Sequence, residues 1–344
     1  MKRLYILTLC SISLASCIFF FKKRKPTTIA IDEGLVIPKE WLVTNKNPQT
    51  QKADARPADQ TFLTFPEWFL VFSPEEQANY FKHHTASTFP FMSHTSQIWQ
   101  SYKIVNDQIK NNFPTNTGYQ FMIWVIGTSA SVEYSIKAGY ETIIGRITDT
   151  GKSTTEEDMF NAKFTQDYVD FIKDRPWYDF DFKSRLKELW SSTSFLGSNF
   201  LRKLDRKYIL TSELLVKYVY GKLIGLGTKQ VYEIALPTTA VILENDSLQN
   251  LPRYDKFAKA AISIAKRGHK FKEIAGNNSA ILLTILVSSE NNINFKNAKI
   301  VFIQPISSDR STKRIALAIP VTNLSSLLKQ LYNDKIKVEH IFDY

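Results

Sequence analysis

Hydrophobic residues recur at three- and four-residue steps along residues 62–232, which is the period of amphipathic helices. Ile98, Tyr102, Val105 and Ile109, for example, would share one helix face. The same reasoning predicts helices over residues 73–83, 92–112, 154–173, 176–190 and 199–226. This part of the chain is therefore expected to be helical and rich in aromatic residues.

Two of these helices have a recognisable beginning. Ser73, Pro74 and Glu76 place a capping serine, a proline at the first helical position and a glutamate at the third. Thr154 and Glu157 form a second capping box. We therefore expect helix starts at these two places.

The pattern changes near residue 234, where runs of β-branched and apolar residues predict strands. The expected strands cover residues 239–244, 271–274, 280–287, 298–306, 314–319 and 337–342. Amphipathic helices over residues 253–267 and 323–332 lie between them. This order predicts an α+β sandwich of ferredoxin-like type with an extra hairpin.

Four regions follow from these patterns, and the fold class they predict is α+β. The regions are a membrane anchor or lipoprotein-type signal (1–25), a linker (26–60), a helical domain (61–233) and an α+β domain (234–344). The linker is expected because four prolines and many polar residues replace any apolar periodicity there.

Residues 4–21 carry no charge over 18 positions, the lower limit for a helix that crosses about 30 Å of hydrocarbon. One interpretation is an uncleaved anchor, and the basic residues 22–25 after it favour a cytoplasmic body. The other is a cleaved signal, because residues 14–17 resemble a bacterial lipoprotein box that would lipidate Cys17 and place the body in the periplasm. The apolar run beyond Cys17 favours the anchor. Both interpretations place the body on a membrane.

The positive charge of the chain is concentrated at its beginning. Residues 1–25 hold six of the 44 Lys and Arg residues and no Asp or Glu, which leaves 38 basic and 33 acidic residues elsewhere. A nucleic-acid-binding protein would need a basic face on its folded part. The nearest candidate is Arg202, Lys203, Arg206 and Lys207, with Asp205 among them. We therefore expect no nucleic-acid partner.

Motifs for common chemistries are missing from the body of the chain. Both cysteines, Cys10 and Cys17, precede it, which excludes thiolate metal sites, redox pairs and disulfides there. His83 and His84 are adjacent, whereas a helical metal pair needs a spacing of three or four. The phosphate-loop, dinucleotide-binding and hydrolase-elbow motifs do not occur. We expect no metal and no cofactor.

The stretch from Gly118 to Arg146 holds the best candidates for acid–base chemistry. Glu133, Lys137 and Glu141 follow one another at four-residue steps, so they share a face if the stretch is helical. In a pocket, such charges would have shifted pKa values and could transfer protons. On a solvated surface, they would form an ordinary ladder of ion pairs. The sequence favours the ladder, with Arg146 as a further polar candidate.

Glu67 is a second candidate, because it lies among apolar and aromatic neighbours. Such surroundings would raise the pKa of its carboxyl and suit a general acid. The alternative is a structural role in the first turn of a helix that begins at Pro66, where the dipole favours a carboxylate.

Aromatic residues are unusually frequent, with 24 Phe, 15 Tyr and six Trp. Most lie in the helical region, where they would form a packed core. They could also line a pocket for a lipid or quinone, or lie at a membrane interface. The candidate ligand-binding residues are Trp68, Trp124, Tyr134 and Tyr140.

Five segments of the chain resemble one family of uncharacterised bacterial proteins that carry a hydrophobic N-terminus. The segments are 53–81 (ADARPADQTFLTFPEWFLVFSPEEQANYF), 121–150 (FMIWVIGTSASVEYSIKAGYETIIGRITDT), 175–190 (RPWYDFDFKSRLKELW), 210–232 (LTSELLVKYVYGKLIGLGTKQVY) and 338–344 (VEHIFDY). The resemblance extends over roughly residues 35–344 and implies a bacterial membrane setting. It implies no activity, cofactor or catalytic residue.

These observations predict a membrane-anchored protein without catalysis. Its helical domain would bind the lipid bilayer or another apolar membrane component, and its α+β domain would bind a partner or regulate. One alternative is an enzyme that uses Glu67, Glu133 or Glu141 as acid or base, which requires these side chains to converge in one cleft. Another is a scaffold subunit of a membrane complex, for which a large exposed apolar patch would be the mark.

Overall fold

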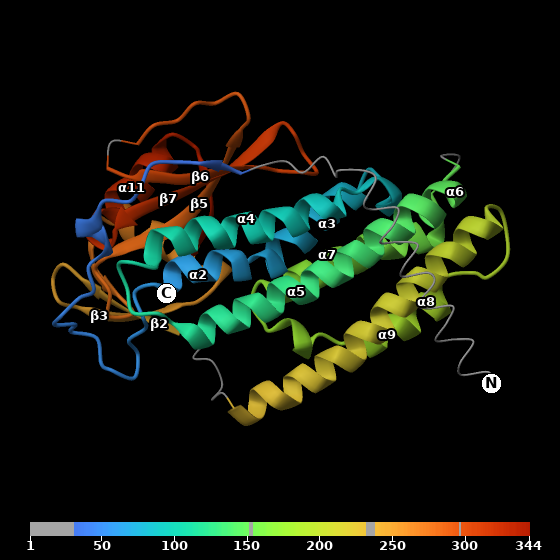
Figure 1. Ribbon diagram of the computed structural model, residues 1–344, viewed down its shortest axis with the longest axis horizontal. Coiled ribbons are helices and arrows are strands. Elements are labelled where there is room, and N and C mark those ends of the chain that lie inside the picture. The colour runs from blue at the N-terminus through green and yellow to red at the C-terminus, as the bar shows by residue number, and fades with distance from the viewer. Residues whose placement is uncertain (1–30, 151–153, 232–237, 296) are drawn as a thin grey trace.

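A computed structural model describes residues 31–150, 154–231, 238–295 and 297–344 (Figure 1). Its described residues form eight α-helices in the N-terminal part, followed by two antiparallel sheets and two further helices. The predicted α+β class is therefore confirmed. The predicted anchor or signal, with Cys17, lies outside the described residues.

The helical part consists of long helices that run along one another (Figure 1). Its α-helices are α2 (Gln60–Glu67), α3 (Phe69–Phe81), α4 (Phe91–Ile109), α5 (Thr117–Tyr140), α6 (Arg146–Thr148), α7 (Glu156–Ile172), α8 (Phe182–Ser192) and α9 (Phe200–Val231). Shorter turns are the 3-10 helices η1 (Lys39–Leu42), η2 (Ala86–Thr88) and η4 (Trp177–Asp179), and a π-helix, η3 (Glu141–Gly145).

Two predicted helix starts are displaced. Helix α3 begins at Phe69 and contains Pro74, so the predicted start at Ser73 is wrong. Burial of Phe69 and Phe72 in the core favours the earlier start and offsets the hydrogen bond that Pro74 cannot donate. The capping box of α7 uses Thr155 and Asp158, one residue beyond the predicted pair.

The C-terminal part contains two separate sheets. The larger has the order β1-β6-β7-β5-β8 and the smaller the order β3-β2-β4, and every pair of neighbours is antiparallel. The strands are β1 (Asp32–Glu33), β2 (Thr238–Leu243), β3 (Leu248–Pro252), β4 (Phe271–Ile274), β5 (Ala280–Ser288), β6 (Lys299–Pro305), β7 (Thr312–Pro320) and β8 (Lys337–Phe342). This arrangement does not confirm the ferredoxin-like detail.

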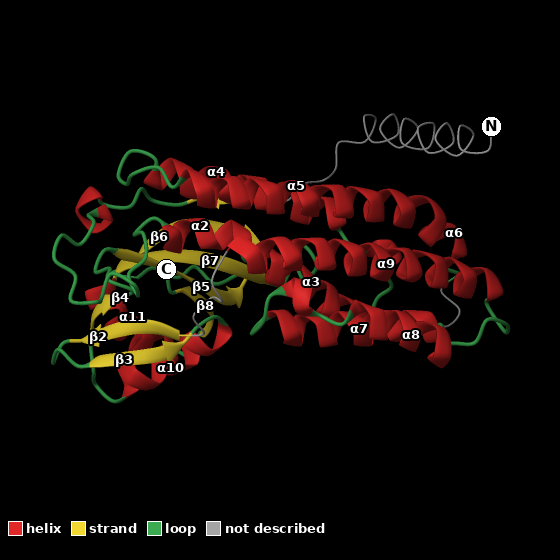
Figure 2. Ribbon diagram, turned by 90° about the horizontal axis from the view of Figure 1, so that it is seen from below, coloured by secondary structure: helices red, strands yellow, loops and turns green. Residues whose placement is uncertain are grey.

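Helices cover both faces of the larger sheet (Figure 2). Helices α10 (Asp255–Lys266) and α11 (Val321–Asn333) pack on one face, and α2 and α4 pack on the other. The ring of Phe65 in α2 lies 4.7 Å from that of Phe302 and 5.6 Å from that of Phe342, measured between centroids. The helical part and the sheet therefore share one hydrophobic core.

Residues 31–59 run along the α+β part. Strand β1 pairs with β6, and the backbone amides of Gln49 and Thr50 donate hydrogen bonds of 3.0 and 3.1 Å to the buried carboxylate of Glu273. The described portion of the predicted linker is thus held against the sheets.

Candidate functional site

Over residues 201–208, helix α9 has its charged residues inside and its apolar residues outside. The side chains of Arg202, Asp205 and Arg206 are buried, whereas Leu201 is 69% exposed. A helix on the surface of a soluble protein normally shows the opposite polarity. The reversal indicates that the outer side of α9 is built to meet something other than water.

Helix α5 continues this outer surface beside α9 (Figure 2). We call their exposed apolar side chains the apolar face. It comprises Phe121, Trp124, Val132 and Ile136 on α5, and Leu201, Leu204, Tyr208, Leu215, Val219, Leu223 and Leu226 on α9. At 1.5 Å per residue, α5 is about 36 Å long and α9 about 48 Å.

An apolar surface of this extent is costly in water, at roughly 25 cal/mol for each Å² left exposed. Contiguous exposed patches on soluble proteins usually mark a surface that binds a protein or a membrane. In the part of the chain that the structure describes, no helix has the length and hydropathy needed to cross a bilayer.

A group of four charges holds α5 against α9 beneath the apolar face. The ammonium group of Lys137 lies 2.8 Å from the carboxylate of Glu213 and 3.1 Å from that of Glu133, and Lys217 lies 2.9 and 3.2 Å from the same two groups. Burial alone would raise the pKa of Glu213, but the two lysines lower it to about 2. Of the predicted solvated ladder, Glu133 and Lys137 form an ion pair, but it is largely enclosed between two helices and Glu141 pairs with Arg206 instead.

A second ionic cluster lies where α5 passes into the π-helix η3. Glu141 accepts two hydrogen bonds from Arg206, and Asp205 accepts others from Arg206 and from the hydroxyl of Tyr140. Burial raises the pKa of Glu141, although Arg206 opposes the shift. Single π-turns inside helices frequently mark functional positions.

The predicted basic candidates also lie at this end of the helical part. These four residues of α9 are buried, and each lies near a carboxylate: Arg202 near Asp158 (2.8 Å), Lys203 near Glu156 (2.9 Å), Arg206 near Glu141 (2.7 Å) and Lys207 near Glu157 (3.6 Å). Arg146 remains exposed, and its Nε donates a hydrogen bond of 3.5 Å to the carbonyl of Ser87.

Glu67 is the last residue of α2, and Pro66 lies inside that helix. The proposed first-turn role of Glu67 is therefore wrong. Its carboxylate accepts a short hydrogen bond from the hydroxyl of Tyr119, and burial raises its pKa. The neighbouring Trp68 is buried and stacks on His340 with 3.9 Å between ring centroids.

The predicted acid–base candidates do not converge. Tyr119, the partner of Glu67, and Glu141 lie near opposite ends of the α5–η3 segment, about 33 Å apart by helix geometry. Glu133 lies between them in the four-charge group. The structure thus places Glu67, Glu133 and Glu141 in three separate environments.

The predicted ligand-binding aromatic residues are likewise dispersed. Trp68 packs against β8, and Trp124 points outward with 55% of its surface exposed. Tyr134 is buried and accepts a hydrogen bond of 3.2 Å from Gln77, whereas Tyr140 contacts α9 through Asp205. Only Trp124 belongs to the apolar face.

Sequence reasoning missed a buried polar cluster between the helices and the larger sheet. The Ser73 hydroxyl lies 3.0 Å from Nδ1 of His94, and Nε2 of His94 lies 3.4 Å from the carboxylate of Glu76. Arg314, on β7, lies 3.7 Å from that carboxylate and donates two hydrogen bonds to Glu339. The spacing of Ser73 and Glu76 places both on one side of α3, but nothing in the sequence pairs them with a strand 240 residues later.

Burial controls the charges of this cluster. It raises the pKa of Glu76 to about 7, against the opposing effect of Arg314. It also lowers the pKa of His94 to about 3, with a further contribution from Arg314. Ser73, Glu76 and His94 are all buried, so the protein encloses this nucleophile–base pair rather than presenting it.

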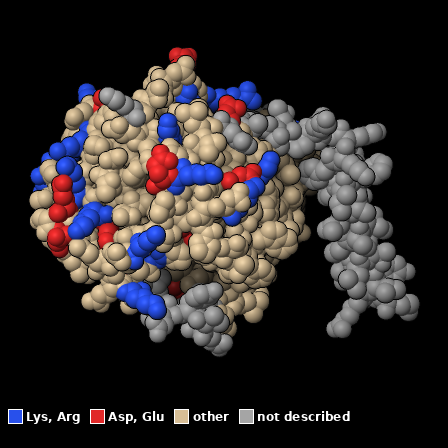
Figure 3. All heavy atoms as spheres, turned by 60° about the vertical axis from the view of Figure 1, so that its left-hand side comes forward, with Lys and Arg blue, Asp and Glu red and all other residues tan. Residues whose placement is uncertain are grey.

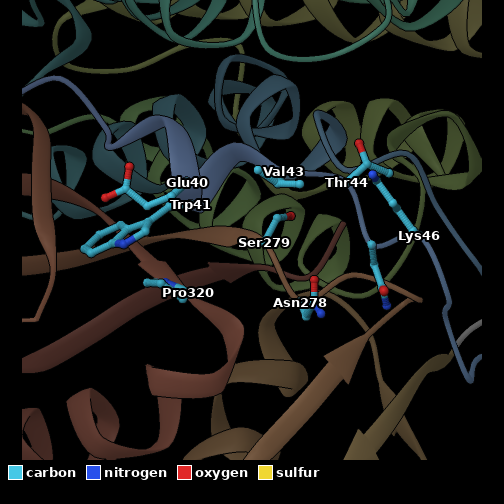
Figure 4. A pocket seen from close by; sticks show the side chains of 9 residues that line it. Glu40, Trp41, Val43, Thr44, Lys46, Asn278, Ser279 and Pro320 are labelled. Carbon is cyan, nitrogen blue, oxygen red and sulfur yellow. The ribbon is translucent and has the colours of Figure 1, made fainter.

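A shallow cleft of about 240 Å³ lies between η1 and the start of β5 (Figure 4). Trp41 lies near Pro320 at one side of it, and Thr44 and Lys46 lie at the other. The remaining lining residues are Glu40, Val43, Thr44, Asn45 and Ser279. Its size and mixed lining would suit a small polar molecule at most.

Charges elsewhere are mixed in sign. On the face shown in Figure 3, Lys and Arg side chains lie next to Asp and Glu side chains.

Comparisons of the chain with protein-family models, with curated proteins and with solved structures found no match. The function is therefore inferred from the geometry and the polarity of the apolar face.

Proposed function

We propose that this chain is a membrane-associated protein without catalysis whose helical part lies against the lipid bilayer through the apolar face. The carrying observation is the reversed polarity of α9, which turns Arg202, Asp205 and Arg206 inward and a row of leucines outward. Charged groups that face a bundle interior, with apolar groups outside, are the arrangement that a lipid environment favours.

The sequence supports a bilayer as the apolar phase. Residues 4–21 form an uncharged segment flanked by Lys and Arg, which we interpret as an anchor or a lipoprotein-type signal. Either form would hold the helical part near lipid, where the apolar face could bury its side chains. The resemblance to bacterial proteins with a hydrophobic N-terminus agrees with this setting.

The shape of the apolar face favours contact along the membrane plane. Long helices with one apolar side lie in the interface and bury that side by about 5–10 Å. Trp124 and Tyr208 on the face are of the residue types enriched at that depth. The finer prediction of a ferredoxin-like sandwich stays a prediction, and the proposed function does not depend on it.

The proposal is tested by flotation with phospholipid vesicles. A chain that begins at residue 26 lacks the predicted anchor but keeps every described contact. We expect this chain to float with vesicles and to lose most of that binding when Leu215 and Val219 are both replaced by Glu. A matched control replaces two exposed leucines elsewhere, Leu35 and Leu248, by Glu and keeps the binding.

Two outcomes would overturn the proposal. One is a chain from residue 26 that never floats, and the other is equal binding by the two double variants. If the chain from residue 26 fails to float and the full chain instead recruits a second protein through Leu215 and Val219, the scaffold alternative replaces the bilayer. The size of the apolar face is the observation that favours that alternative.

A further inference from the structure

We infer that the apolar face docks on a bilayer that contains anionic phospholipid, whose headgroups are bound by basic residues along both edges of the face. The inference rests on the proposed function and names its lipid partner. Helices α4 and α8 flank α5 and α9. The supporting observation is the charge that α4 and α8 carry beside the apolar face.

Helix α8 forms the edge beyond α9. The indole nitrogen of Trp190 donates a hydrogen bond of 3.1 Å to the hydroxyl of Thr211 on α9, which fixes the two helices side by side (Figure 2). Lys183 and Lys187 precede Trp190 by seven and three residues, so all three share one side of α8. Both lysines are exposed, and they border the apolar residues of α9.

Helix α4 forms the opposite edge, beyond α5. Trp99 of α4 donates a hydrogen bond of 2.9 Å to Ser131 of α5. Lys103 follows Trp99 by four residues and lies on the same side of the helix, with its ammonium group exposed. The apolar face thus has a basic residue on its α4 edge and two on its α8 edge.

Two further basic residues lie at one end of the apolar face and among its apolar side chains. Arg146 is exposed just beyond α5, and Lys222 is exposed among the apolar residues of α9. Among the acidic groups nearby, Asp107 lies 2.6 Å from Lys110 and Glu133 lies within 3.2 Å of both Lys137 and Lys217, whereas Asp181, near Lys222, accepts hydrogen bonds from Ser184. The exposed basic residues Lys103, Arg146, Lys183, Lys187 and Lys222 outnumber these acidic groups, so the net charge around the face is positive.

Such an arrangement matches the chemistry of an anionic membrane surface. Lysine and arginine beside a buried apolar stripe attract acidic headgroups over a distance of about one Debye length. Their aliphatic stems can lie along the apolar surface while their charged ends reach the headgroups. A purely zwitterionic bilayer would satisfy the apolar residues but would bring no net negative charge beside Lys103, Lys183 and Lys187.

The test uses the full chain in vesicles that contain a phospholipid with a photoreactive group on its acyl chain. Mass spectrometry measures labelling of residues 201–226 relative to residues 4–21, which serve as the internal reference. We expect this ratio to rise several-fold when phosphatidylglycerol is added to phosphatidylcholine, and to fall again at high salt. The triple variant Lys103→Ser, Lys183→Ser, Lys187→Ser should show no rise.

A matched control replaces three exposed lysines of the α+β part, Lys259, Lys270 and Lys329, by Ser and should behave as the wild type. Circular dichroism confirms that both variants fold. Equal labelling in neutral and anionic vesicles, or an unchanged rise in the triple variant, overturns the inference but leaves the proposed function standing. Absence of labelling of residues 201–226 in every vesicle overturns both.

Discussion

The guanidinium group of Arg206 donates two hydrogen bonds, of 2.7 and 3.0 Å, to the carboxylate of Glu141. This pair joins α9 to the π-helical turn η3, and both side chains are buried. At this level of α9, charged side chains are buried while apolar side chains are exposed. Buried ion pairs of this kind hold α9 in the orientation that exposes the apolar face.

Replacing Arg206 by Met should therefore be strongly destabilising. The change leaves Glu141 and Asp205 buried without this guanidinium, and breaking a buried pair costs roughly 3–5 kcal/mol. Urea unfolding followed by circular dichroism measures the loss. The double variant Arg206→Met, Glu141→Gln removes the orphaned charge and should recover part of it. A single variant as stable as the wild type would contradict the role of the pair.

Gly145 should not tolerate a side chain, because the π-turn brings its backbone against the ion pair. A methyl group there would lie 2.2 Å from Oε2 of Glu141, whose carboxylate Arg206 holds in place. We expect Gly145→Ala to lower the melting temperature. The control is Gly227→Ala on α9, where the methyl group meets open space and should be neutral or stabilising by up to about 1 kcal/mol. Similar effects of the two changes would contradict this account.

Truncation of two adjacent leucines of α9 should affect stability to very different extents. Leu214 is fully buried and Leu215 is 49% exposed. Leu214→Ala should cost about 2–5 kcal/mol in the free energy of unfolding, whereas Leu215→Ala should cost less than about 1 kcal/mol. Vesicle binding should be weakened by Leu215→Ala. Large destabilisation by both changes would show that the outer side of α9 is packed against protein.

Because of the buried cluster around His94, the free energy of unfolding should depend on pH. The pKa of Glu76 is raised by burial from its ordinary 4.5 to about 7, so the folded state binds this proton more tightly than the unfolded chain. The contribution of Glu76 to the free energy of unfolding is complete below pH 4.5 and is lost as the pH rises through 7. At about 1.4 kcal/mol per pKa unit, the loss reaches at most about 3 kcal/mol.

The variant Glu76→Gln isolates this contribution. The pKa of His94 is lowered, so its own contribution is present above pH 6.5 and lost as the pH falls toward 3, but it is common to both proteins. Urea unfolding between pH 4.5 and 7 should show the wild type losing stability relative to Glu76→Gln as the pH rises. Parallel curves for the two proteins would contradict the assignment.

Much of the fold could be predicted from periodicity. Strands β4 and β8 match their predicted ranges, and α10 and α11 lie within two residues of theirs. Strands β1 and β3 were missed because they are short and polar, and only pairing with β6 and β2 makes them strands. Local residue types could not reveal such tertiary pairing.

The candidate site was less predictable for a physical reason. Leucines and charges alternate along α9 with similar spacing, so the sequence pattern does not say which side faces the core. The answer depends on Glu141, Asp158 and Lys137, whose approach to α9 is a tertiary contact. The basic run 202–207, which was the nearest candidate for a basic face, is therefore buried, and the leucines beside it are exposed.

The most direct test of the central claim is the quenching of Trp124 fluorescence by brominated acyl chains, with the full chain in phospholipid vesicles. Trp124 is exposed on the apolar face, whereas Trp68 is buried against β8. If the face contacts lipid, Trp124→Phe should remove a large share of the bromine-quenchable emission and Trp68→Phe should remove little. Emission from Trp124 that bromine leaves unchanged and aqueous iodide quenches would contradict the account.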